Sequence, residues 1–174
     1  FSTTLSFPNA IAMNNASVLR FLGATHVTFD GGTSKNITFQ MPPLATNVIT
    51  RVIGGTPIDT ASNNITIKNC KIIGNSSVNG PNTGMGIYVG NAVNSGTPLV
   101  STKGGSQSIS FIGNEISGVR SGIEFWTSGT SPNLLIKSNI IGGNIPTGTL
   151  QNSTFIGGAS NTAGIRVKGV NDCV

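Results

Sequence analysis

Acidic side chains are scarce in this sequence, which limits the catalysis it could support. Five carboxylates and one histidine occur in 174 residues. Hydrolysis of a glycosidic bond uses two carboxylates that face each other, and calcium binding needs several oxygen ligands at one place. No spacing in the sequence specifies either site, and His26 stands beside Val27 in a strand-like context that favours a structural role. We assign no catalytic residue, metal site or cofactor, and a non-enzymatic role is favoured over catalysis. The acids are Asp30, Asp59, Glu115, Glu124 and Asp172.

A second set of side chains suits contact with carbohydrate. The only Tyr and the only Trp of the sequence occur with one acid and two basic residues on short recurring segments. A flat strip of aromatic rings and charged groups can stack against sugar rings and bond their hydroxyls. The alternative is that loops of the same repeat cover the two rings, as amphipathic aromatic side chains readily allow. The candidate ligand-binding residues are Tyr88, Glu124, Trp126, Arg166 and Lys168.

Three segments that begin with glycine must position this strip. The sequences Gly-Ile-Tyr-Val, Gly-Ile-Glu-Phe and Gly-Ile-Arg-Val occur at 86–89, 122–125 and 164–167. Side chains alternate between the two faces of a strand, so the isoleucines are expected inside and Tyr88, Glu124 and Arg166 outside. Neighbouring strands about 4.8 Å apart would bring Glu124 next to Arg166, with Trp126 and Lys168 in the next outward column.

Another recurring segment precedes these strands and contains a turn. It occupies 64–74, 108–118 and 133–143. Matching positions at the turn hold Cys70, Asn114 and Asn139. Stacked Asn side chains can bond to one another and to turn backbone, which predicts an asparagine ladder with Cys70 at one end. The alternative is that Asn stands there only because it favours turns. Lys71 and Glu115, which follow the ladder positions, are expected to face outward on neighbouring strands, where an exposed ion pair is worth only about 0 to 1 kcal/mol.

Repeats separated by stretches of unequal length indicate a solenoid. The intervening stretches are rich in Gly, Ser, Thr, Asn and Pro, and a solenoid accommodates such differences as loops on one side. In that arrangement Ile65, Ile109 and Leu134 must lie over one another. Strand-like residues at 27–29 and 37–39 flank an Asp-Gly-Gly turn signal and indicate an earlier coil.

These segments make the chain resemble the right-handed parallel β-helix, or pectate-lyase-like, proteins. Residues 26–32 and 63–72 are similar to repeats of large secreted surface proteins of the Bacteroidetes type. The resemblance covers roughly residues 24–168. It implies an all-β, right-handed parallel β-helix solenoid with irregular loops between short strands. Proteins of this group often carry a signal for type IX secretion.

The resemblance and the repeats together predict a single β-helix domain or fragment over 1–174. We expect an irregular first coil or cap at 1–25 and regular coils at 26–174. The sequence begins at Phe1 without an initiator Met, which reads as a mature or excised piece of a larger protein.

Composition excludes several classes of protein. Charged residues make up 9% of the chain against about 25% in a typical soluble domain, which argues against coiled coils and helical bundles. The net charge is +5, but the basic residues are scattered, so no nucleic-acid partner is predicted. No apolar run approaches the roughly 20 residues of a membrane span, so no membrane insertion is predicted. Cys70 and Cys173 match neither a zinc site nor a CxxC pair, and their bridging stays open.

The function that follows from these expectations is structural. We predict a segment of a large secreted cell-surface protein that acts as a stalk or adhesin and contacts surface glycans. Its other partners would be neighbouring coils or domains of the same chain. The alternative is a polysaccharide lyase or glycoside hydrolase of the same fold, and an ice-binding solenoid is the least favoured class. Thr60, in Asp-Thr-Ala at 59–61, matches a short O-glycosylation signal of exported proteins in the Bacteroidetes group.

Overall fold

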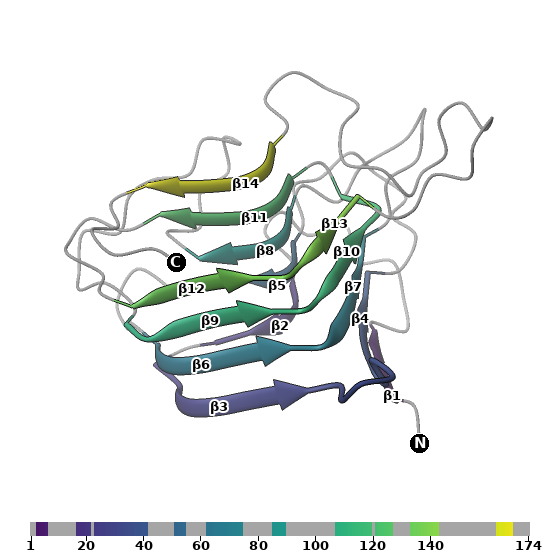
Figure 1. The fold of residues 1–174 in the computed structure, drawn as a ribbon, viewed down its shortest axis with the longest axis horizontal. Helices are drawn as coiled ribbons and strands as arrows, with labels where there is room; N and C mark the ends of the chain where they lie inside the picture. Colours follow the sequence, from purple (N-terminus) through teal and green to yellow (C-terminus); the bar gives the residue numbers. More distant parts are fainter. Residues whose placement is uncertain are drawn as a thin grey trace.

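The described part of the chain is built entirely from β-strands. The computed structural model describes residues 3–6, 17–21, 23–41, 51–54, 62–74, 85–89, 107–119, 121–126, 133–142 and 163–168. Within these ranges the chain forms fourteen strands and no helix (Figure 1). The described residues accordingly contain no helix of the length and apolar character needed to cross a bilayer.

The strands assemble into three sheets, here called A, B and C. Sheet A contains β1 (Thr3–Ser6), β4 (Ile37–Gln40), β7 (Cys70–Ile73), β10 (Glu115–Ser117) and β13 (Ile140–Ile141). Sheet B contains β2 (Ser17–Arg20), β5 (Arg51–Gly54), β8 (Met85–Val89), β11 (Ser121–Trp126) and β14 (Ala163–Lys168). Sheet C contains β3 (Thr25–Asp30), β6 (Asn63–Lys68), β9 (Ile109–Ile112) and β12 (Leu134–Lys137).

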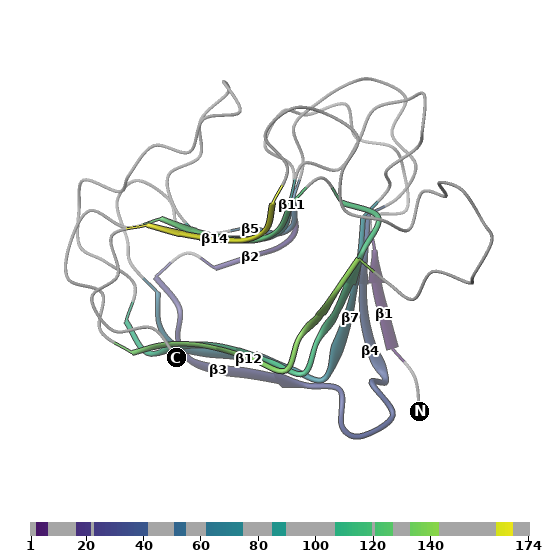
Figure 2. The same cartoon turned by 45° about the horizontal axis from the view of Figure 1, so that its top comes forward.

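Strand order follows one rule from β1 to β14. Successive strands enter sheets A, B and C in turn, and every strand pairs with the strand three places before it or after it. All the pairings are parallel. Figure 2 shows the three sheets as three sides around a common interior. The all-β class expected from the sequence is confirmed.

Apolar side chains fill this interior in columns, a column being the register partners on successive strands of one sheet. The predicted alignment of Ile65, Ile109 and Leu134 is confirmed as one such column of sheet C. Because each column buries its side chains against the strands on either side, the core repeats along the stack. Further columns are Phe39, Ile72 and Ile116 in sheet A, Ile53, Ile87 and Ile123 in sheet B, and Ile67, Phe111 and Ile136 in sheet C.

A sharp corner divides each recurring turn segment into two strands. The residue that makes the corner is Asn69, Gly113 or Ser138, each with a positive φ between 52° and 63°. The left-handed region suits Gly and Asn, which explains two of these residue types. Each repeat therefore supplies three strands, where the sequence pattern predicted at least two. Residues 3–6 and 17–20 of the N-terminal stretch already pair in register with β4 and β5.

Candidate functional site

The backbone register of sheet B agrees with the predicted strip. Glu124 of β11 pairs with Tyr88 of β8 on one side and with Arg166 of β14 on the other. Two residues further along the same strands, Trp126 of β11 pairs with Lys168 of β14. The alternation of apolar and polar residues therefore aligned the strip correctly, because parallel register fixes which residues neighbour one another.

The two described side chains of this strip are buried. Tyr88 is 1% exposed and Glu124 is 2% exposed. Alternation assigns a side chain to a face of the strand, but it does not say what packs on that face. Both residues have further interactions within the protein. They cannot offer a flat surface to a sugar ring, and this result agrees with the packing alternative.

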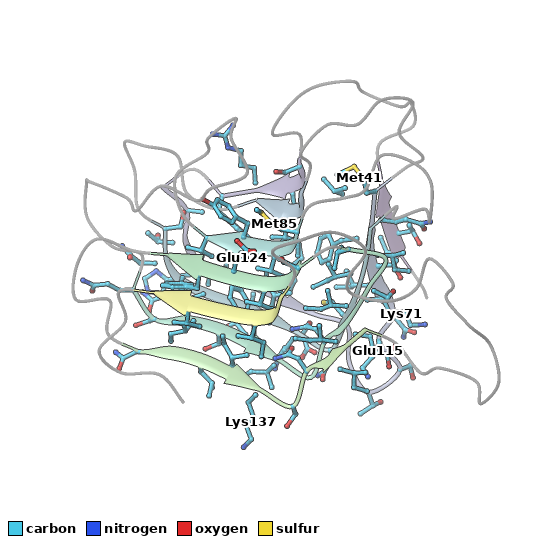
Figure 3. All side chains as sticks on the ribbon, turned by 90° about the horizontal axis from the view of Figure 1, so that it is seen from above. Met41, Lys71, Met85, Glu115, Glu124 and Lys137 are labelled. Carbon is cyan, nitrogen blue, oxygen red and sulfur yellow. The ribbon has the colours of Figure 1, made fainter. Side chains whose placement is uncertain are left out.

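The other members of the strip are described only by their backbone. Trp126, Arg166 and Lys168 lie on β11 and β14, and their side chains fall outside the described residues. In Figure 3, Glu124 projects from sheet B near Met85, whereas Lys71 and Glu115 lie on another side of the molecule, along sheet A. The charged residues of the described chain are thus divided between faces.

The asparagine ladder is present at the corner between sheets C and A. Oδ1 of Asn114 accepts the amide of Cys70 at 3.0 Å, and Oδ1 of Asn139 accepts the amide of Asn114 at 3.0 Å. Nδ2 of Asn114 donates to Oδ1 of Asn139 at 2.9 Å. The predicted contact between the two asparagines is therefore confirmed, and turn preference alone does not account for these side-chain bonds.

The ladder also holds the strands of sheet C. Nδ2 of Asn114 donates to the carbonyl of Ile67 at 2.9 Å, and Nδ2 of Asn139 donates to the carbonyl of Phe111 at 2.8 Å. Each Asn thus bonds the backbone of the preceding repeat through both atoms of its amide group. Asn114 is fully buried, and these bonds satisfy a polar group that would otherwise destabilise the core.

Cys70 occupies the end of the ladder that the sequence predicted. Its side chain is fully buried as a free thiol, and Sγ lies 3.1 Å from the carbonyl of Lys68. Burial raises the pKa of this thiol, because the interior disfavours the thiolate. A neutral, inaccessible thiol is a poor nucleophile, so its role is packing. Cys173 lies outside the described residues.

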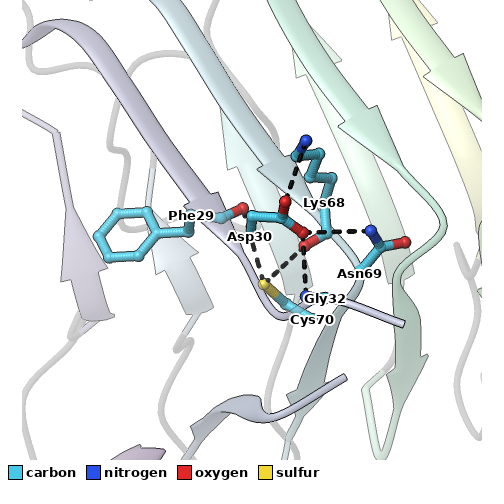
Figure 4. A network of polar contacts seen from close by, with 6 residues as sticks. All are labelled: Phe29, Asp30, Gly32, Lys68, Asn69 and Cys70. Carbon is cyan, nitrogen blue, oxygen red and sulfur yellow. Dashed lines mark hydrogen bonds and ion pairs between the residues drawn. The ribbon is translucent and has the colours of Figure 1, made fainter. Parts of the chain in front are cut away.

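A polar network surrounds Asp30 next to this corner (Figure 4). Oδ1 of Asp30 accepts the amide of Gly32 at 2.9 Å and Nδ2 of Asn69 at 3.2 Å. Oδ2 forms an ion pair with Nζ of Lys68 at 3.0 Å. The bond from Gly32, followed by those from Lys68 and Asn69, lowers the pKa of Asp30 below its ordinary value. The carboxylate therefore stabilises the Asp-Gly-Gly turn.

A second ion pair differs from the expected arrangement. Lys71 and Glu115 are register partners, as predicted. However, Glu115 forms its ion pair with Lys35, at 2.7 Å between Nζ and Oε1. Lys35 lies in the turn before β4, where its positive φ of 50° belongs to the tight backbone path. Sequence spacing could not identify this partner, because the turn brings Lys35 to a strand 80 residues away.

Left-handed residues also recur at the start of the sheet C strands. His26, Asn64, Ser108 and Asn133 have positive φ angles between 54° and 69°. Nδ2 of Asn64 lies 3.3 Å from Nε2 of His26. The structural role expected for His26 agrees with this position in the backbone. The sequence signal was the recurrence of Asn and short polar residues at the start of these strands, since such residues tolerate a positive φ.

These arrangements do not assemble a described metal or carboxylate-pair site. Of the five acids, Asp30 and Glu115 each pair with lysine, and Glu124 is buried on sheet B. Asp59 and Asp172 lie outside the described residues, as does the glycosylation candidate Thr60. Within the described ranges no group of three His, Cys, Asp or Glu residues could hold a metal ion.

Comparison of the chain with protein families, curated proteins and solved structures gave no match.

Proposed function

We propose that the chain is a segment of a right-handed parallel β-helix solenoid and works as a rigid stalk or adhesin segment of a large exported surface protein. The observation that carries this proposal is the unbroken A, B, C order of fourteen parallel strands. The similarity of its repeats to pectate-lyase-like and Bacteroidetes-type surface proteins supports the same reading.

Rigidity follows from how neighbouring coils would be joined. Three parallel sheets and an apolar core connect each coil to the next, and the asparagine ladder joins the corners at Cys70, Asn114 and Asn139. A solenoid built in this way gains length by adding coils without a new core, which suits a spacer. A low charge and many small polar residues also suit an exported protein.

The stalk function is tested in the full-length protein. The segment 1–174 is replaced by a Gly/Ser linker of equal contour length, and adhesion of the cells is measured together with surface display by antibody labelling. We expect normal display and reduced adhesion, because a flexible linker does not hold the distal domains away from the surface. Unchanged adhesion at equal display would exclude the rigid stalk.

Contact with surface glycans is the second part of the proposal, and it now concerns Trp126, Arg166 and Lys168. Register places Trp126 beside Lys168. Trp126→Ala is expected to lower retention on a glycan array about fivefold or more with little change in Tm, since loss of a stacking ring costs about 1 kcal/mol. Tyr88→Phe serves as the control with unchanged retention, because Tyr88 is buried. A large fall in Tm of the Trp126 variant would instead indicate a packing role.

The enzymatic alternative has a direct test. The protein is incubated with neutral and acidic polysaccharides, with and without calcium. New reducing ends would indicate hydrolysis, and an unsaturated product that absorbs in the ultraviolet would indicate β-elimination. We expect neither product, since both described acids outside sheet B are held in ion pairs with lysine.

A further inference from the structure

The last described strand of sheet B leaves part of its core column open. Ile165 of β14 belongs to the same column as Ile123 and Ile87, yet it is 49% exposed while they are 0% and 1% exposed. Ile140 of β13 is 46% exposed, but it continues the outward column of Lys71 and Glu115 and is not part of a core column. These are the large exposed apolar side chains of the described residues, and both lie on last strands. The end formed by β12, β13 and β14 is here called the C-terminal face, and Ile165 is the core-column residue that it leaves exposed.

The strand order indicates where a further strand would pair on this face. Among the described residues, sheets A and B have five strands and sheet C has four. Because the order is A, B, C and β14 is in sheet B, the next strand belongs beside β12. A second copy stacked in the same direction would begin with β1, a strand of sheet A, and would leave the position beside β12 empty. A coil that begins with a sheet C strand leaves no gap.

The asparagine ladder adds a chemical requirement for that coil. In the two complete steps, the ladder Asn accepts the amide of the ladder residue before it. The same Asn also donates a hydrogen bond to a backbone carbonyl of the preceding repeat, three residues before the ladder residue of that repeat. This is the carbonyl of Ile67 for Asn114 and the carbonyl of Phe111 for Asn139. The next step would accept the amide of Asn139 and donate to the carbonyl of Ile136.

We propose that the C-terminal face binds one further coil of the same repeat, in which a strand with alternate apolar residues pairs with β12 and is followed by a ladder asparagine. The proposal rests on the proposed solenoid. It continues the established pairing of every earlier strand, and the partner is recognised by three features: a sheet C strand first, apolar residues in the core columns, and Asn at the corner.

An extended protein tests this partner. A copy of residues 127–168 is inserted after Lys168, so that its first strand can pair with β12 and its own asparagine can continue the ladder. We expect Tm to rise by about 5 °C or more. Amide exchange at Asn139 and along β14 should slow by about tenfold or more. The matched control carries serine at the copied Leu134 and Ile136, and it should give neither effect.

A point substitution provides a second test, which does not depend on whether the serine control variant folds. Ile165→Ser should lower Tm only slightly in the unextended protein. In the extended protein the decrease in Tm should be several-fold larger, because only the added coil would bury that side chain. Equal effects in both proteins, or unchanged exchange at Asn139, would overturn the proposal. Concentration-dependent association of the unextended protein in sedimentation velocity would also overturn it by identifying a second copy as the occupant. Cell adhesion plays no part in these measurements, so they can fail or succeed independently of the stalk function.

Discussion

Asn114 shows how a polar side chain can be a core residue. It is fully buried, and its amide group bonds the backbone of one neighbouring repeat and the side chain of the other. In a parallel stack the corner amides and carbonyls lie at the same place in every repeat. One Asn per corner can therefore satisfy groups that would otherwise be buried without partners.

Substitution of Asn114 tests the ladder. Asn114→Ala removes the acceptor of the Cys70 amide and the donor to the Ile67 carbonyl, and we expect a loss of about 2–4 kcal/mol in the free energy of unfolding. Asn139→Ala, at the partly buried end, should cost about 1 kcal/mol. Urea denaturation measures both, with the exposed Gln40→Ala as control. Equal losses for the two asparagines would contradict a ladder whose interior step matters most.

Asp30 supplies a prediction for the pH dependence of stability. Its pKa is lowered in the folded protein, so its stabilising contribution is present above the unfolded pKa of about 3.9 and is lost as the pH falls through the folded value. Asp30→Asn keeps an acceptor for the Gly32 amide and removes the charge that faces Lys68.

We expect the variant to have a slightly lower Tm than the wild type at pH 7, because an exposed ion pair contributes little. The difference should disappear in acid, where Asp30 is protonated in both states. Thermal melts followed by circular dichroism across the pH range measure it. A difference of constant size down to about pH 2 would show that the charge is not responsible.

At the scale of elements, the second residue of β8, β11 and β14 is a glycine, and at Gly86 the reason is steric. A methyl group on Gly86 would lie 2.5 Å from Cγ2 of Ile116 and 2.7 Å from the carbonyl oxygen of Gly122. Here sheet B approaches the core of sheet A closely. The equivalent Gly164 of β14 has no atom within 4 Å of that position.

The two glycines therefore form a matched pair for mutagenesis. Gly86→Ala should destabilise the protein by about 1–3 kcal/mol, since the Ile116 side chain and the backbone must shift. Gly164→Ala should be neutral or stabilising by up to about 1 kcal/mol. Chemical denaturation of both variants gives the comparison. A stable Gly86 variant would mean that the corner can widen without loss of packing.

For the whole molecule, stability should depend on position along the stack. Each strand contacts mainly its neighbours in the same sheet, so an interior residue is covered on both sides and a terminal residue on one. Ile123→Ala should cost about 2–5 kcal/mol, and Ile165→Ala should cost less than about 1 kcal/mol. Equilibrium unfolding in urea measures both. Similar losses would show that the interior and the terminal position of this column are equally buried in solution.

The same dependence bears on function. In the proposed role as a stalk, position would be transmitted along the length of the segment, and the working part would be the continuous core rather than a single cleft. The burial of Tyr88 and Glu124 shifts the search for a glycan surface toward Trp126 and Lys168 on the same sheet. The open C-terminal face defines how the rod would be continued.

The repeated pattern of residue types determined much of this protein by itself. Alternation within strands predicted the columns, and matching positions predicted the ladder of Asn114 and Asn139 and the register of Glu124 with Arg166. These features depend on local periodicity and on which residues share a position in successive repeats, and both can be seen in a linear sequence. The separate short strand after each corner was harder to recognise, because two to four residues are too few to show a period.

Only the tertiary structure decided which groups meet between repeats and which are hidden from water. Glu115 pairs with Lys35 instead of Lys71, and Glu124 is buried although its position is polar. Both outcomes depend on how turns and neighbouring segments fold over a face in three dimensions. A residue's alternation along its own strand fixes the direction of its side chain, but the partners in that direction come from distant parts of the chain.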